Sequence, residues 1–272
     1  MVQERKATDS AANTTVDLLD RPLSPRSLIG SLLLGMRPPR MLGGRLVEWC
    51  ALFGVAEGTA RVALSRMVDR GELAATDGVY ELAGPMRQRQ PAQDWSLAPE
   101  MSVWEGEWLL GVVRAGSRTA GERSALREAG RRLRMVEVRE GLWARPDNLP
   151  RAASPPEAWA TADAQCEWWR ARPDADAVAT ASRLFAPKAW AARARVLERR
   201  LASSTAAVAG GDGAAVADAF VVGAAALAHV RADPLLPSEL CGAQWPGDEL
   251  RIAYRDYQAA FGNAVREWFR SR

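Results

Sequence analysis

The chain has 272 residues and a formal net charge of +3, with 48% hydrophobic and 25% charged residues. This length allows two or three domains, and this composition excludes a disordered or fibrous chain. Three widely spaced cysteines and a single histidine exclude a structural zinc site and a disulfide framework, so we expect a cytoplasmic protein with no metal.

The first 22 residues are polar and lack hydrophobic periodicity, so the sequence predicts a disordered tail over residues 1–22. This stretch has no apolar segment of the kind found in a signal peptide. The longest apolar run, residues 219–230, is shorter than a membrane span. We therefore expect no membrane partner.

Three short helices are predicted next, over residues 24–36, 43–54 and 54–73. Asp77-Gly78 then lies between two strand-like runs and predicts a hairpin turn. Three helices followed by a hairpin is the order of a winged helix-turn-helix, which we place at residues 23–88. Residues 21–90 hold four more basic than acidic residues, an excess compatible with a polyanionic partner.

The third helix has small and apolar residues on one face and polar residues on the other. We expect the polar face to be the recognition surface for double-stranded operator DNA. The residues expected there are Thr59, Arg61, Val62, Ser65 and Arg66. Arg26 and Arg45, on the first two helices, are candidate phosphate contacts. The alternative is a solvated surface helix with no partner.

A linker rich in Pro and Gln is predicted over residues 84–99, followed by a strand, a helix and one or two strands up to residue 146. This unit could be half of a ferredoxin-like sheet, in a central domain over residues 89–150. Helices are predicted over residues 155–171, 187–202, 214–230 and 248–272, in a helical domain over residues 151–272. The expected fold class is therefore α+β.

Three stretches point to one family: "RSLIGSLLLG", "FGVAEGTARVALSRMVDRGEL" and "HVRADPLLPSELCGAQWPG". Together with "WEGEW" and "EGLWARP", they resemble the PaaX-like regulators, the phenylacetic acid repressor type, over residues 24–270. The resemblance implies a winged helix, a central domain similar to the Cas2 fold and a helical C-terminal domain. It also implies a homodimer that represses an aromatic or acyl-CoA catabolic operon until an aryl-CoA or acyl-CoA thioester such as phenylacetyl-CoA binds.

The resemblance suggests where such an effector would bind. His229 and Arg231 would line the pocket, and Trp104 and Trp108 would stack on an aryl or adenine group. The alternatives are a packed histidine or a charge partner at a helix C-terminus, and tryptophans that fill the core. The sequence departs from many winged helices at the hairpin, which is acidic at Asp77 and Glu81.

The sequence does not predict an enzyme. A Cas2-like nuclease needs an acidic residue at the end of its first strand, where this chain has Arg114. The sequence has no nucleophile elbow and no nucleotide-binding glycine motif, so no cofactor is expected. Two alternatives stay open: a DNA-binding protein without an effector, and an acyl-CoA hydrolase that uses His229 as a base.

Overall fold

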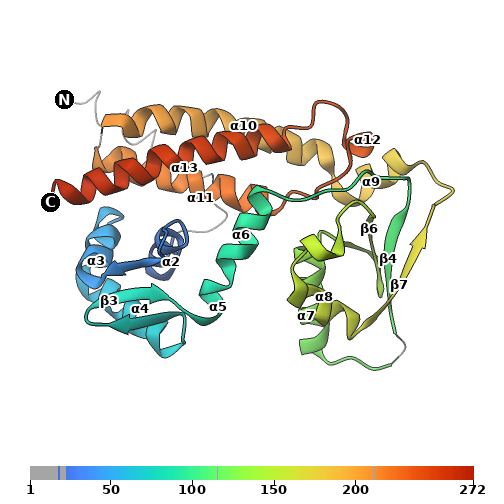
Figure 1. The fold of residues 1–272 in the computed structure, drawn as a ribbon, viewed down its shortest axis with the longest axis horizontal. Helices are drawn as coiled ribbons and strands as arrows, with labels where there is room; N and C mark the ends of the chain where they lie inside the picture. Colours follow the sequence, from blue (N-terminus) through green and yellow to red (C-terminus); the bar gives the residue numbers. More distant parts are fainter. Residues whose placement is uncertain (1–17, 19–22, 115, 211) are drawn as a thin grey trace. The chain divides into compact units, whose positions relative to one another are not determined.

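The computed structural model describes residues 18, 23–114, 116–210 and 212–272. The tail predicted over residues 1–22 lies outside the described residues, apart from Leu18. The described part is α+β, with helices and two antiparallel sheets, which confirms the expected class (Figure 1).

The chain divides into two compact units. The first unit contains the described residues up to Asp94, together with Val196–His229 and Glu249–Arg272. The second unit contains Trp95–Arg195 and Val230–Asp248.

The first unit opens with three helices and a three-stranded antiparallel sheet. The helices are α2 (Pro25–Leu34), α3 (Gly43–Leu52) and α4 (Glu57–Asp69), and the strands are β1 (Arg40–Leu42), β2 (Leu73–Thr76) and β3 (Val79–Leu82). The strand order is β1-β3-β2. The three predicted helices and the hairpin are confirmed, whereas β1 was not predicted because three residues give no detectable alternation.

A glycine separates α3 from α4. Gly54 has a φ of 74°, and its N–H donates to the carbonyl of Ala51. The next N–H, of Val55, donates to the carbonyl of Cys50, which completes a Schellman motif. Because only glycine adopts this conformation without strain, Gly54 ends α3 and lets the chain turn directly into α4.

The hairpin between β2 and β3 has a two-residue turn. Thr76 pairs with Val79, and the residues between them, Asp77 and Gly78, have φ angles of 50° and 76°. Two positive φ angles define a type I′ turn, whose twist suits antiparallel strands. The sequence signal at Asp77-Gly78 is therefore confirmed.

The interior of the first unit contains an aromatic cluster around Trp49 of α3. Its indole is fully buried and meets Phe220, Phe261 and Trp268 edge to face, with ring centroids 5.1, 6.4 and 6.2 Å away. These partners lie on α11 (Gly213–Arg231) and α13 (Gly247–Arg270). Another long helix, α10 (Pro187–Ala207), precedes them in the chain. The helices predicted over residues 187–202, 214–230 and 248–272 are thus confirmed.

Among the described residues, one helix, α11, is long and apolar enough to cross a membrane by length and composition. Its packing explains the apolar composition without a bilayer. Phe220 and Ala219 are buried, and the Ala219 carbonyl accepts a 2.8 Å hydrogen bond from the hydroxyl of Tyr257 on α13. Gly223 lies so close to the same tyrosine that a methyl group there would come 2.3 Å from its oxygen.

The segment predicted as a linker, residues 84–99, is helical and forms α5 (Gly84–Arg87) and α6 (Arg89–Leu97). The boundary between the two units, after Asp94, falls inside it. Pro85 and Pro91 lie in the first turns of these helices, where the backbone N–H has no partner to lose. Arg and Gln are good helix formers, and burial of Met86 and Leu97 holds the segment in place.

The second unit is built on a four-stranded antiparallel sheet. Its elements run β4 (Trp108–Val113), α7 (Ala120–Arg132), β5 (Val136–Arg139), β6 (Leu142–Pro146), α8 (Pro156–Asp163) and β7 (Cys166–Ala171). The strand order is β5-β6-β4-β7. The strands and the helix predicted between residues 104 and 146 are confirmed.

The helix predicted over residues 155–171 is wrong in its second half, which forms β7. Alternate residues of this strand face opposite sides of the sheet. Cys166 and Trp168 pack under the helices, whereas Glu167 and Trp169 face the other way. Two adjacent tryptophans masked this alternation in the sequence.

The two faces of this sheet are covered differently. Helices α7 and α8 cover one face, over a cluster that includes Leu109 and Trp143 (Figure 1). The opposite face packs in part against α9 (Ala177–Phe185) and α12 (Ser238–Cys241), which bury Trp108 and Ala144. The remainder, which we call the open face, exposes 38% of Val112.

Close packing of α7 on the sheet gives a test of this architecture. An alanine methyl group at Gly130 would lie 2.5 Å from the ring of Trp143, so Gly130→Ala should lower the free energy of unfolding by about 1–3 kcal/mol. Gly121→Ala, on the same helix, meets only the Thr119 hydroxyl at 3.8 Å and should be neutral or stabilising. Urea unfolding followed by circular dichroism measures both, and equal effects would contradict the packing.

Candidate nucleic-acid interface

Helix α4 presents one buried and one exposed face. Ala60, Leu64 and Met67 are at most 3% exposed and pack on the rest of the unit. All five residues predicted to contact DNA lie on the opposite, exposed face: Thr59, Arg61, Val62, Ser65 and Arg66. The structure therefore brings the predicted residues of α4 together on one accessible surface.

The two arginines of this face differ in their surroundings. Arg61 pairs with Glu57 one turn earlier, with 2.8 Å between Nε and Oε1. Both side chains are about two-thirds exposed, so water screens the pair and the guanidinium can exchange its partner. Within the described part of the chain, Arg66 has no ion-pair partner. Glu57 was not singled out in the sequence, although its spacing of four residues from Arg61 is a recognisable signal.

The Arg26 side chain forms an ion pair inside the first unit. Its Nε and Nη2 each donate a 2.8 Å hydrogen bond to the carboxylate of Glu72, which joins α2 to the start of β2. This bidentate bond lowers the pKa of Glu72 and raises that of Arg26. Arg26 thus has a structural role here, and its phosphate contact stays a prediction.

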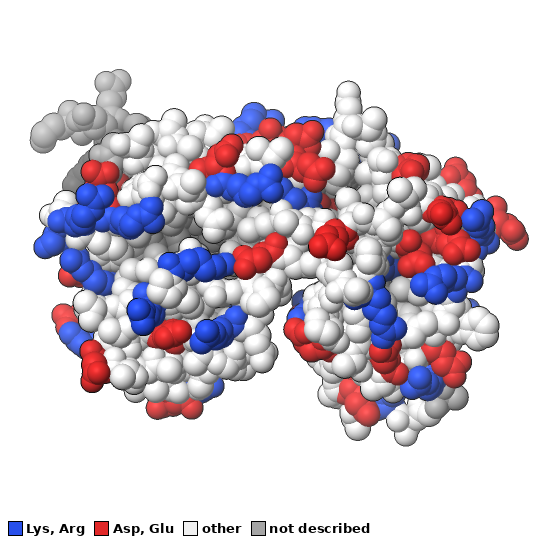
Figure 2. Space-filling model, in the orientation of Figure 1, with Lys and Arg blue, Asp and Glu red and all other residues white. Residues whose placement is uncertain are grey.

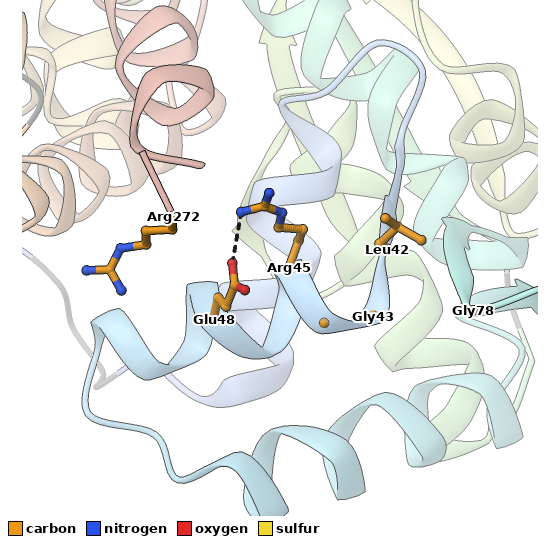
Figure 3. Close-up of a pocket in the computed structure, with 7 residues that line it drawn as sticks. Leu42, Gly43, Arg45, Glu48, Gly78 and Arg272 are labelled. Atoms are coloured by element: carbon orange, nitrogen blue, oxygen red, sulfur yellow. Dashed lines mark hydrogen bonds and ion pairs between the residues drawn. The ribbon is translucent and has the colours of Figure 1, made fainter. Parts of the chain in front are cut away.

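Arg45, at the start of α3, donates to the Phe269 carbonyl at 2.7 Å and to Glu48 at 3.2 Å. It lines an open pocket of ≈ 350 Å³ (Figure 3), whose lining is Leu42, Gly43, Gly44, Arg45, Glu48, Gly78 and Arg272. Leu42 is the one large apolar side chain among these residues. Since acyl and aryl groups need mostly apolar walls, this pocket is a poor candidate for an acyl-CoA effector.

The charge of the whole surface does not by itself mark an interface. Figure 2 shows basic and acidic side chains mixed over the visible face of both units. No single-sign field dominates that face, so long-range attraction of a polyanion is modest. The reason to consider a DNA interface is instead the group of polar and basic side chains on the exposed face of α4.

The tryptophans predicted to bind an effector pack inside the second unit. Trp108 is 1% exposed, and Trp104 packs on the same cluster and donates its Nε1–H to the Glu107 carbonyl at 2.6 Å. These contacts favour the core-packing alternative. His229 is buried and the Arg231 side chain is exposed, and the effector role of all four residues stays a prediction.

The distinctive stretch "DPLLPSEL" is held by a chain of buried hydrogen bonds. The Asp233 carboxylate accepts the N–H of Leu235 at 2.8 Å, and the Leu235 carbonyl accepts from Asn148 at 3.0 Å. The Asn148 side-chain oxygen in turn accepts from Arg145 at 2.7 Å. Asn148 and Asp233 are at most 1% exposed. The loop is therefore part of the framework of the second unit.

Arg145 itself lies on β6 and is a buried cation, 3% exposed, whose guanidinium reaches the C-terminal end of α7. It donates to the carbonyls of Leu133 and Pro146, at 2.8 Å each. Burial lowers its pKa, but the group stays protonated at neutral pH. Because Leu133 caps α7, its carbonyl lies at the negative end of the helix dipole and stabilises the charge. No sequence pattern around Arg145 indicated this role.

The comparisons with known proteins agree with this geometry. The family model described as PaaX-like protein matches residues 24–85, the segment that forms α2 to α4 and the hairpin. The structure of the uncharacterized protein Rv0674 from Mycobacterium tuberculosis is 34% identical, with a TM-score of 0.66. The similarity covers 90% of this chain and 98% of that one. The chain belongs to the PaaX-like family.

The PaaX-like family consists of repressors of phenylacetic acid catabolism, and at this level the protein is a transcription regulator. Among curated proteins, none matches the chain. The segment matched by the family model contains the exposed face of α4 and also Arg26 and Arg45.

The buried arginine provides a test of the framework. Arg145→Met removes a charge whose acceptors cannot find water, so the free energy of unfolding should fall by about 3 kcal/mol or more. Arg170→Met is the matched control, because Arg170 is exposed and pairs with Asp147 on the surface. It should cost less than about 1 kcal/mol. Equal losses in urea unfolding would contradict the role of the buried network.

Proposed function

We propose that this PaaX-like protein is a homodimeric repressor whose α4 reads operator DNA and whose binding is relieved by an aryl-CoA or acyl-CoA thioester. The single observation that carries the proposal is the exposed face of α4, which presents both Arg61 and Arg66. In support, α2, β1, α3, α4, β2 and β3 follow one another in the order of a winged helix-turn-helix.

The physical basis is the fit of a helix in the major groove. The groove is about 12 Å wide and admits one α-helix, whose arginines can donate two hydrogen bonds to a guanine edge. Each such contact contributes roughly 1–3 kcal/mol of discrimination against other bases. Thr59 and Ser65 supply hydroxyl groups for phosphate or base contacts on the same face, and Val62 supplies an apolar surface for a thymine methyl.

The hairpin contributes less in this proposal. Asp77 occupies the turn, and Glu81 pairs with Arg87 at 3.4 Å. An acidic turn repels phosphates, so specificity rests on α4 rather than on the wing. In a homodimer, two copies of α4 would meet half-sites about 34–36 Å apart, or a multiple of that distance.

The second unit would carry the effector response. Its β-α-β-β-α-β order, with β7 and β5 at the sheet edges, is that of a ferredoxin-like domain. We place the effector in the body of the protein, with His229, Arg231, Trp104 and Trp108 as candidate contacts, and expect its binding to misalign the two recognition helices. The family supports a cytoplasmic regulator rather than a hydrolase, and the burial of His229 argues against its use as a base.

The recognition face is tested by removing its charges. Arg61→Ala and Arg66→Ala should each weaken binding to the upstream intergenic DNA by about 10- to 100-fold, because each removes a bidentate base contact. Together they should also flatten the dependence of binding on salt. Fluorescence anisotropy at two salt concentrations measures both effects. Arg127→Ala, an exposed arginine on α7, is the matched control. Unchanged specific binding by the double variant would contradict the assignment of α4.

The effector response is tested with a panel of acyl-CoA and aryl-CoA thioesters. One of them should release the wild-type protein from specific DNA at micromolar concentration, whereas free CoA should not. Binding that is indifferent to every thioester would contradict this half of the proposal and leave a DNA-binding protein without an acyl-CoA effector. Native mass spectrometry on the same samples reports which thioester is retained.

A further inference from the structure

The open face of the second unit carries a row of four residues that spans the sheet from edge to edge. Arg139 of β5 pairs with Leu142 of β6, which pairs with Val112 of β4, which pairs with Glu167 of β7. Directly paired residues of antiparallel strands point to the same side. The register of β5 shifts between Glu137 and Arg139, so Val138 and Arg139 together oppose Leu142, and Val138 packs on this side of the sheet. The row therefore reads basic, apolar, apolar, acidic over three strand spacings, or about 14 Å.

This row is accessible and its charges are not used internally. Val112 is 38% exposed, and Trp169, which is adjacent on β7, is 59% exposed. Both end residues of the row are exposed. Within the described residues, neither Arg139 nor Glu167 takes part in an ion pair. An exposed tryptophan beside apolar residues, with an unused charge at each end, is typical of a protein interface.

We propose that a second copy of this chain packs face to face on the open face, about a two-fold axis parallel to the strands. Such an axis reverses the row of the partner. Arg139 then faces the partner's Glu167, and Glu167 faces the partner's Arg139. Leu142 faces the partner's Val112, Val112 faces the partner's Leu142, and Trp169 closes one side. The surface is thus complementary to itself, as a closed dimer requires.

The charges also select the orientation. A two-fold axis perpendicular to the strands, in the same plane, would place Arg139 on the partner's Arg139 and Glu167 on the partner's Glu167. Like charges in contact disfavour that arrangement. Two sheets packed face to face lie about 10 Å apart, a distance that the side chains of the row can fill. This inference rests on the proposed function, because it names the interface of the proposed dimer.

The test is a charge swap on the full-length protein. Arg139→Glu or Glu167→Arg alone turns both attractive pairs into repulsive ones and should raise the dimer Kd about tenfold or more in sedimentation equilibrium. The double variant restores both pairs and should return the Kd to within about threefold of wild type. Trp169→Ala should raise the Kd at least about thirtyfold, as the loss of an aromatic anchor from each copy.

Arg127→Glu, on the helix-covered side of the sheet, is the matched control and should leave the Kd unchanged. Single reversals without effect, or no recovery in the double variant, would overturn the interface. Specific DNA binding by the same variants separates the two proposals. A wild-type protein that stays monomeric yet binds specific DNA overturns the interface and not the role of α4. A dimer that obeys the charge swap but binds no specific DNA supports the interface and overturns the proposed function.

Discussion

Burial of Trp49 is the constraint on which the positions of α3 and α4 depend. This indole extends from α3 into a cluster of rings supplied by α11 and α13, more than 160 residues later in the chain. Large aromatic side chains contribute much of the apolar area that a core buries. Because α3 is anchored in this way and joined to α4 through Gly54, the exposed face of α4 is held on a rigid support. The segment from α2 to β3 therefore does not form a compact unit of its own.

The buried Arg145 has a comparable role in the second unit. A cation without water is costly, and it is tolerated where carbonyl and amide oxygens surround it in fixed positions. Here those oxygens come from the end of α7, from β6 and from Asn148, and Asn148 then holds the Leu235 loop. This explains how "DPLLPSEL" can be a distinctive sequence without lining a binding pocket.

The sequence predicted the helices and the hairpin well, because their signals are local. Gly54, Asp77-Gly78 and the spacing of Ala60, Leu64 and Met67 each follow from backbone geometry or periodicity. The strand β7 was missed because Trp168 and Trp169 are both bulky and apolar, although they face opposite sides of the sheet. The helical nature of residues 84–97 was missed because prolines indicate loops unless they stand in a first turn.

The candidate site likewise has a part that local sequence signals predict and a part that they do not. The face of α4 could be predicted, since one helix determines which residues share a side. Tertiary partners could not, so the pairing of Arg26 with Glu72 and the burial of Trp108 emerged only from the structure. Glu57, the ion-pair partner of Arg61 within α4, also bears on how this face would bind an anion. The Glu57 carboxylate occupies Nε and Nη2 of Arg61, so a phosphate that bound to these two atoms would have to displace it. If α4 reads an operator as proposed, that competition would weaken contacts to single phosphates more than contacts to a guanine, which offers two acceptors. It would thus favour rapid release from non-cognate DNA.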